Sequence, residues 1–278
     1  MGAVQLCVVD AFTPVPFAGN PAGVCLTDSR DAAWMQAVAA EMNLSETAFV
    51  DTSTLAARGE VGLRWFTPTT EVEICGHATL ASAHVLYETG EVTAPIAFRT
   101  AVGVLRAERS GESAIALDFP VDVPVPALPD SRLADEFADA LGVAVVGVAR
   151  CRYDVLVEVP SAQDVRHLEP DLSALRAASG RGVIVTAAAD GADGEGGTAD
   201  FVSRFFAPAV GIDEDPVTGS AHCCLAPYWA ERLGRASLVG AQLSRRGGVV
   251  GVEVAGERVL LRGNAVTVIR GELGAESA

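Results

Sequence analysis

The run RWFTPTTEVEICGHATLASAHVL (64–86) indicates the architecture of this protein, because the chain repeats its pattern later as RFFAPAVGIDEDPVTGSAHCCLAPYW (204–229). Each version begins with an Arg–aromatic–Phe–x–Pro run at the end of a β-type segment. Each then reaches a glycine, Gly76 or Gly219, that opens an Ala-rich pattern with helical spacing. Chance similarity between two Ala-rich helices is the alternative, but the matching strands upstream favour a duplicated unit of strand and helix.

Along the whole chain, predicted strands outnumber predicted helices, and each half holds one long, mostly apolar helix. This pattern predicts a curved sheet wrapped around a central helix in each half. The run PVDVPVPALPD (120–130) is rich in proline and reads as a linker. We therefore expect an α+β fold of two similar, pseudo-symmetric halves at 1–119 and 131–278, whose last strands can pack back on the first half.

The local signals predict individual elements. PVPFAGNPAG (14–23) is dense in Gly, Pro and Asn, so we expect no regular structure there. The predicted helices cover 31–42, 76–88, 132–141 and 218–234. The predicted strands cover 4–12, 46–50, 61–66, 95–99, 103–109, 114–119, 153–159, 182–187 and 200–206. The acidic run DGADGEGG (190–197) is expected to be a solvated loop.

Composition excludes several classes of partner. The formal net charge is −16, from 36 acidic and 20 basic residues, and the longest basic cluster is Arg245–Arg246. Nucleic acid and anionic membrane surfaces are therefore not expected partners, and no apolar stretch approaches the roughly 18–20 residues that span a bilayer. Six cysteines lie mostly inside apolar patterns, which predicts reduced thiols and a cytoplasmic protein.

An anionic ligand would have to overcome this negative charge. A helix start offers unpaired N–H groups and about half a positive charge, and a glycine there lets a ligand oxygen approach closely. If a pseudo-twofold axis relates the two copies, both helix starts reach one cleft. Such a cleft would bind a carboxylate without Lys or Arg.

Three side chains near the two copies are candidates for acid–base chemistry. Glu46 is expected on a strand face with small apolar neighbours, where partial desolvation would suit a general base; the alternative is an exposed edge residue. His77 follows the first helix start, where the dipole would lower its pKa and favour neutral imidazole, although a His is also simply tolerated there. Asp215 precedes the second helix start, where it could equally cap the helix, as could Thr218.

The cysteines allow other interpretations. Cys75 directly precedes the first helix start and could be a stabilised thiolate, whereas Cys223 and Cys224 suit small buried hydrophobes. A zinc site from these cysteines and nearby histidines is not expected, because adjacent helical residues diverge by about 100° and no Cys-x-x-Cys occurs. No metal is predicted.

At these residues the chain resembles the PhzF-like, or phenazine biosynthesis-like, family of the diaminopimelate epimerase-like fold. Four long runs carry the resemblance nearly end to end: VDAFTPVPFAGNPAGV, NLSETAFV, LRWFTPTTEVEICGHATLASAHVL and FFAPAVGIDEDPVTGSAHCCLAPYW. The resemblance implies a cofactor-free isomerase that shifts a proton on a small carboxylate-bearing substrate, amino acid-like or cyclic, in an interdomain cleft. It also implies a homodimer.

The resemblance also implies roles for individual residues. Glu46 corresponds to the general acid/base, with His77 and Asp215 as its partners. The positions expected to bind the substrate carboxylate or shape the pocket are Asn20, Gly76, Gly219 and Ser220. Cys75-Gly76-His77 is also similar to a segment of proline racemases, which use two cysteines, but no cysteine stands before Gly219. A racemase or epimerase using Cys75, and a non-catalytic small-acid binding protein, therefore remain alternatives.

Overall fold

The computed structural model describes residues 4–28, 30–55, 59–111, 113–128, 132–178, 180–191 and 198–274. The chain forms two compact units, one of Met1–Asp118 with Arg262–Ala278 and the other of Phe119–Leu261. The C-terminal strand therefore belongs to the first unit, while the predicted linker at 120–130 opens the second.

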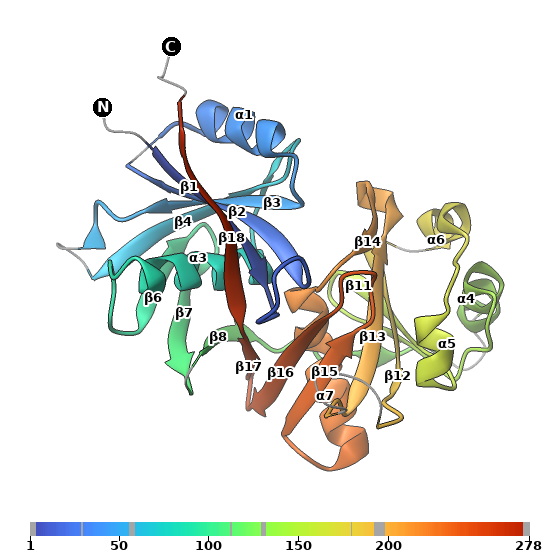
Figure 1. Cartoon of the computed structure of the whole chain (residues 1–278). Coiled ribbons are helices and arrows are strands. Elements are labelled where there is room, and N and C mark those ends of the chain that lie inside the picture. The colour runs from blue at the N-terminus through green and yellow to red at the C-terminus, as the bar shows by residue number, and fades with distance from the viewer. Residues whose placement is uncertain are drawn as a thin grey trace. The chain divides into compact units, whose positions relative to one another are not determined.

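The strands of the first unit surround one central helix. They are β1 (Val4–Ala11), β2 (Asn20–Thr27), β3 (Glu46–Asp51), β4 (Glu60–Phe66), β5 (Glu71–Val72), β6 (Ile96–Thr100), β7 (Gly103–Ser110), β8 (Ala114–Pro120) and β18 (Ala265–Leu273). The central helix α3 (Gly76–Glu88) packs against β1, β2, β3, β7 and β18. A second helix, α1 (Ala32–Met42), covers the other face of the sheet (Figure 1).

The second unit follows the same plan. Its strands are β9 (Val125–Pro126), β10 (Gly147–Arg150), β11 (Asp154–Glu158), β12 (Gly182–Ala188), β13 (Phe201–Ala207), β14 (Ile212–Asp215), β15 (Ser237–Gln242), β16 (Gly248–Ala255) and β17 (Arg258–Gly263). Its helices are α4 (Leu133–Leu141), α5 (Ala162–Arg166), α6 (Leu172–Ala178), the 3₁₀ turn η2 (Pro208–Val210) and the central α7 (Gly219–Leu233).

Strand pairing shows that the repeated sequence reflects a repeated topology. In the first unit β2 and β3 are parallel, β3 and β4 antiparallel, β4 and β6 parallel, and β6 and β7 antiparallel. In the second unit β11 and β12, β12 and β13, β13 and β15, and β15 and β16 pair in the same senses. The expected α+β class, with mostly antiparallel sheets around central helices, is confirmed.

The arginines of the two Arg–aromatic–Phe runs make matching contacts. Arg64 on β4 forms a bidentate pair with Glu71, with Nε–Oε1 and Nη2–Oε2 distances of 2.7 and 2.8 Å, and lies over the Phe66 ring. Arg204 on β13 pairs with Glu214 through the same atoms at 2.7 and 3.0 Å and lies over Phe206. The repeated run therefore builds the same strand and hairpin twice.

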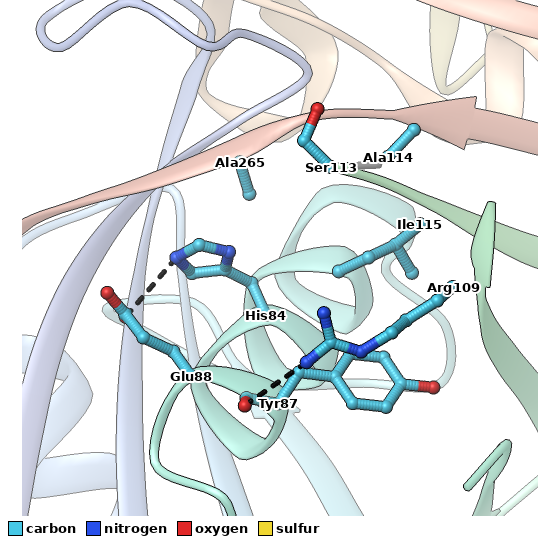
Figure 2. A pocket seen from close by; sticks show the side chains of 8 residues that line it. All are labelled: His84, Tyr87, Glu88, Arg109, Ser113, Ala114, Ile115 and Ala265. Atoms are coloured by element: carbon cyan, nitrogen blue, oxygen red, sulfur yellow. Dashed lines mark hydrogen bonds and ion pairs between the residues drawn. The ribbon is translucent and has the colours of Figure 1, made fainter. Parts of the chain in front are cut away.

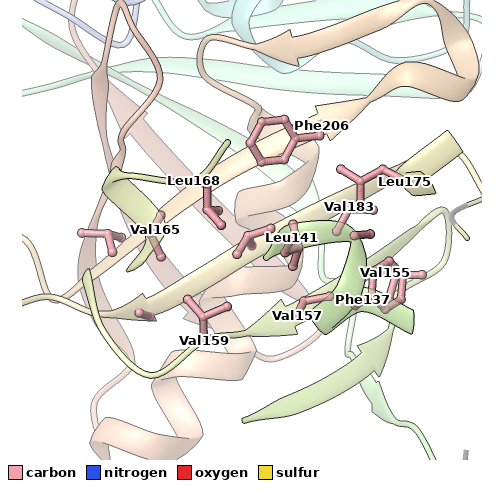
Figure 3. Packing of buried hydrophobic residues seen from close by; sticks show 14 of the residues in the cluster. Phe137, Leu141, Val155, Val157, Val159, Val165, Leu168, Leu175, Val183 and Phe206 are labelled. Carbon is pink, nitrogen blue, oxygen red and sulfur yellow. The ribbon is translucent and has the colours of Figure 1, made fainter. Parts of the chain in front are cut away.

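Both faces of each sheet are covered, so each unit has more than one buried layer. Nearly every residue of α3 is buried, which suits a helix that is apolar on all sides. In the second unit, α4, α5 and α6 cover the face opposite α7. Figure 3 shows Phe137, Leu141, Val165 and Leu175 from these helices against the strand residue Val183.

Most predicted elements agree with the structure to within a residue or two, and the helix at 76–88 has the bounds expected. The prediction that 14–23 holds no regular structure is wrong from Asn20 onward, because β2 starts there and pairs with β1. Most of the predicted acidic loop (190–197) lies outside the described residues.

The expectation that all six cysteines are reduced is also wrong. Cys151 and Cys224 form a disulfide across a Cα–Cα distance of 6.6 Å, while Cys7, Cys25, Cys75 and Cys223 are free. The fold places the end of β10 beside α7, and a sequence separation of 73 residues gave no sign of this contact. The cysteines of this chain therefore do not indicate a reducing compartment.

Candidate active site

The first turn of α3 holds His77 at the centre of a polar cluster. The His77 side chain is only 5% exposed, and both of its ring nitrogens have partners. Nδ1 lies 3.2 Å from Asn20 Nδ2 and 3.6 Å from Cys75 Sγ. Nε2 lies 3.3 Å from Ser45 Oγ and 3.3 Å from Glu46 Oε2. The structure thus brings together the predicted catalytic residues Glu46 and His77 and the predicted substrate-binding residue Asn20. Cys75, whose participation the sequence left open, lies in the same cluster.

These contacts indicate one tautomer of His77. The Asn20 amide nitrogen is a donor, so Nδ1 of His77 must accept. The Ser45 hydroxyl donates to Asn20 Oδ1 at 3.4 Å, which agrees with this orientation of the amide. The ring proton is then on Nε2, where it can be donated to the Glu46 carboxylate.

Burial keeps this imidazole neutral. Desolvation lowers the pKa of His77 to about 3 from its usual 6.5. The predicted direction of the shift is confirmed, but burial is the cause rather than the helix dipole. At neutral pH His77 is therefore an uncharged hydrogen-bond donor.

The loop between β1 and β2 positions Asn20, which is completely buried. Asp10 accepts a hydrogen bond from the Phe17 backbone N–H at 2.6 Å and closes this loop. Gly19 then turns the chain with φ +63°, and a Cβ there would lie 2.2 Å from the Ala11 carbonyl oxygen. Only glycine fits, so the Gly-Asn pair fixes where β2 begins.

Glu46 is the first residue of β3, which pairs in parallel with β2 through the Ala22–Glu46 register. Its side chain is 15% exposed, so the carboxylate is partly desolvated but reachable, and the exposed-edge alternative is wrong. The predicted role of Glu46 as general base stays a prediction.

The same cluster could hold a metal ion. Glu46, Cys75 and His77 each offer a ligand atom within 4.8 Å of the others. Carboxylate, thiolate and imidazole together are ligands that suit Zn²⁺. The zinc site considered from the sequence combined Cys75 and His77 with Cys223 and the histidines at 84 and 222, and it did not include Glu46.

A second polar network lies at the start of α7, where Asp215 is 7% exposed. Thr218 is the N-cap residue, but its side chain makes no cap bond; Oγ1 instead donates to Asp215 Oδ2 at 2.5 Å. Gln242 Oε1 accepts from Thr218 N at 2.9 Å, and Gln242 Nε2 donates to Asp215 O at 2.7 Å. The network holds Asp215 beside the buried Gly219 that opens the helix.

Two side chains of this network were not predicted. Gln242, at the end of β15, is 1% exposed and joins Asp215 to the N-cap. Arg181 donates from Nη2 to Ser220 Oγ at 3.0 Å and pairs with Asp154. Neither lies in a motif, and only strand pairing brings them to α7, so the sequence held no signal for them.

His222 occupies the same first turn but faces the core. Its Nδ1 donates to the Thr218 carbonyl at 2.8 Å, and burial lowers its pKa to about 4. Within the described residues, Nε2 has no hydrogen-bond partner, and a Cβ on Gly240 would lie 3.0 Å from it. His222 is therefore a neutral core residue.

A separate cavity of about 240 Å³ lies at the other end of α3. Figure 2 shows its lining, in which His84 Nε2 lies 3.3 Å from Glu88 Oε2 and Arg109 donates to the Tyr87 carbonyl. Burial lowers the pKa of His84. Seven residues, or roughly 10 Å of helix, separate His84 from His77, so this cavity is distinct from the His77 cluster.

Comparison with known proteins decides what kind of protein carries these clusters. The profile of the phenazine biosynthesis-like protein family matches residues 9–271. This chain belongs to the phenazine biosynthesis-like family. An uncharacterized isomerase of Halalkalibacterium halodurans is 48% identical over 276 residues, with 98% of this chain and 99% of that protein covered.

Solved structures agree with this assignment. A PhzF-family phenazine biosynthesis protein from Enterococcus faecalis matches with a TM-score of 0.87 and 39% identity, covering 99% of this chain and all of that one (100%). A hydroxyproline epimerase from Agrobacterium vitis shares the fold at a TM-score of 0.58 and 12% identity, over 98% of this chain and 92% of that one. Relatives that match over nearly the whole chain are named isomerases, and the protein is an enzyme of the isomerase class.

The sequence also led to predictions about membrane association, oligomeric state, cellular location and cofactor. Within the ranges described above, no helix is long and apolar enough to cross a membrane. A homodimer, a cytoplasmic location and the absence of a cofactor stay predictions. So do the substrate-binding roles of Asn20, Gly76, Gly219 and Ser220.

Proposed function

We propose that this phenazine biosynthesis-like protein is a cofactor-independent isomerase that moves a proton on a small, carboxylate-bearing, amino acid-like or cyclic substrate. The observation that carries the proposal is the contact between Glu46 Oε2 and His77 Nε2 at 3.3 Å, next to a buried Asn20 that fixes the tautomer. A partly exposed carboxylate with an oriented neutral donor is suited to take a proton from carbon and return it.

In this mechanism Glu46 removes the proton from a carbon that the adjacent substrate carboxyl group makes acidic. The C–H electron pair passes to the substrate as enolate-like charge, and the protonated Glu46 then delivers the proton to another carbon of the same substrate. His77 donates its Nε2–H to Glu46 in the resting state, and this hydrogen bond orients the carboxylate. No electrons leave the substrate, so the step is balanced without an oxidant or reductant.

The proposal gives Asp215 and the first turn of α7 the task of holding the substrate. The N–H groups at a helix start can bind a carboxylate and stabilise charge that develops there. Asp215, fixed by Thr218 and Gln242, suits a substrate amine or hydroxyl. One positioned acid/base typically contributes about 10²–10⁴-fold, so orientation and these dipoles must supply the rest.

Deuterium exchange tests the proposal. The protein is incubated in D₂O with a panel of small cyclic and aromatic amino acids, and proton NMR follows the loss of carbon-bound hydrogen. We expect exchange in at least one compound, and a fall of about 10²–10⁴-fold for Glu46→Gln. Glu41→Gln, an exposed glutamate on α1, is the matched control.

Two results would contradict the proposal. One is a folded Glu46→Gln protein that exchanges at the wild-type rate. The other is no exchange in any compound of the panel, which removes the amino acid-like substrate class. A non-catalytic small-acid binding protein predicts this second result together with measurable binding.

A racemase or epimerase that uses Cys75 is the second candidate. The observation in its favour is the Cys75 Sγ contact with His77 Nδ1 at 3.6 Å, which adds a third acid–base group to the cluster. Cys75→Ser separates the two candidates. Turnover by Cys75→Ser should be nearly unchanged if Glu46 alone moves the proton. Interconversion of the two stereoisomers, followed by chiral chromatography, should be abolished if the thiol is the second base.

A further inference from the structure

The helix starts were expected to bind a carboxylate without any basic side chain, yet an arginine lies at the second one. Arg181 precedes β12, and Asp154 begins β11; the parallel register pairs Asp154 with Gly182. This register brings the Arg181 guanidinium to the first turn of α7, where Nη2 donates to Ser220 Oγ at 3.0 Å.

Asp154 holds this guanidinium in a fixed orientation. Arg181 Nε and Nη2 donate to the two Asp154 carboxylate oxygens at 2.9 and 2.5 Å. The Asp154 side chain is 4% exposed, whereas that of Arg181 is 34% exposed. The carboxylate is thus buried behind the arginine, and the open part of the guanidinium faces away from it.

Within the part of the chain that the structure describes, the hydrogen bonds of Arg181 use two of its three guanidinium nitrogens. Nε and Nη2 account for the bonds to Asp154 and Ser220, and among the described residues Nη1 has no partner. In a planar guanidinium, Nη1 shares an edge with the Nη2 hydrogen that points to Ser220. A ligand oxygen bound to Nη1 would therefore lie beside the Ser220 hydroxyl.

The charges around the guanidinium agree with a permanent cation. Burial opposes the charge, but the hydrogen bonds and charge of Asp154, and more weakly the charge of Asp215, outweigh it and raise the pKa of Arg181. Arg181 is thus within electrostatic range of a predicted catalytic residue. The rings of Tyr153 and Phe205 lie 5.2 and 5.9 Å from its central carbon.

Arg204, in the same unit, is a structural arginine and differs from Arg181. It forms the same bidentate pair, with Glu214, but its Nη1 also donates to the Leu168 carbonyl at 2.7 Å, and its side chain is 13% exposed. All three guanidinium nitrogens of Arg204 donate to the protein, whereas Nη1 of Arg181 has no partner among the residues that the structure describes.

We propose that Arg181 is the cationic group of the substrate subsite in the second unit, where its Nη1 binds the carboxylate of the substrate beside Ser220. This inference rests on the proposed function and adds to it the side chain that binds the carboxylate of the substrate. The acidic chain then presents one oriented positive charge at this subsite, which favours a carboxylate over its neutral amide.

Binding of benzoate and benzamide tests the inference without turnover. Isothermal titration calorimetry should show that the wild-type protein prefers benzoate. A hydrogen bond to a charged partner corresponds to a change of about tenfold to a hundredfold in Kd, so Arg181→Gln should weaken benzoate binding by that factor and leave benzamide unchanged. Arg235→Gln, which removes an exposed arginine paired with Asp200, should change neither.

A second variant is needed as a control for misfolding, because Arg181→Gln leaves the buried Asp154 carboxylate without its partner and destabilises the fold. Asp154→Asn combined with Arg181→Gln replaces the ion pair by two neutral amides and should lose the benzoate preference equally. The inference is overturned if these variants bind benzoate like wild type, or if the wild-type protein does not prefer benzoate to benzamide. Deuterium exchange measured with the Glu46→Gln protein tests the proposed function separately, because benzoate binding requires no catalysis.

Discussion

Acidification should destabilise this protein through its buried histidines, and His77 gives the clearest case. In the unfolded chain His77 takes up a proton below its usual pKa of 6.5, whereas the folded protein keeps it neutral down to about pH 3. Because the unfolded state binds more protons, the free energy of unfolding falls as the pH drops below about 6.5, and the loss is complete below the folded-state pKa.

The two pKa values give the magnitude. Between pH 7 and pH 4.5, His77 alone should lower the free energy of unfolding by about 2.5 kcal/mol. His222, whose pKa is lowered to about 4, should add a similar amount. Urea unfolding at the two pH values, followed by fluorescence and by circular dichroism, measures the total.

Substitution isolates the contribution of one histidine. His77→Asn should make the loss of stability between pH 7 and pH 4.5 smaller by about 2.5 kcal/mol, whereas His167→Asn, which removes an exposed histidine, should leave the loss unchanged. A His77→Asn protein that lost as much stability as wild type would show that His77 is not the source of this loss. An NMR titration in which the His77 ring protonates near pH 6.5 in the folded protein would show the same.

Three further outcomes are expected. Reduction of the Cys151–Cys224 disulfide should lower the free energy of unfolding by up to about 4 kcal/mol, because the bond closes a loop of 73 residues. Urea unfolding with and without dithiothreitol measures this loss. Dithiothreitol should have no such effect on Cys151→Ser. Gly240→Ala places a Cβ 2.5 Å from a buried phenylalanine ring and should destabilise the fold by about 1–3 kcal/mol. Gly271→Ala, whose Cβ would have nothing within 4 Å, should not destabilise it. Thermal unfolding compares the two variants. Zn²⁺ should inhibit deuterium exchange reversibly by occupying the cluster that contains Cys75, and inhibition that EDTA does not relieve would contradict this.

Local sequence signals predicted the elements that depend on nearby residues. The helix at 76–88 has apolar residues on all sides and a glycine at its start, and its bounds were correct. The start of β2 was missed, because Asn20 and its neighbours have the composition of a loop. That segment is a strand because it pairs with β1 and β3, and such pairing is a tertiary effect that overrides local preference.

For the candidate site, sequence motifs predicted the family, the duplicated plan and the catalytic candidates Glu46, His77 and Asp215, because each motif is a run of residues adjacent in the chain. The folded structure was needed to assign the tautomer of His77, since its partner Asn20 is 57 positions away. It also placed Arg181 beside Ser220, 39 positions away. Hydrogen-bond partners and burial depend on strand register and helix packing, and these join residues whose separation in sequence carries no signal.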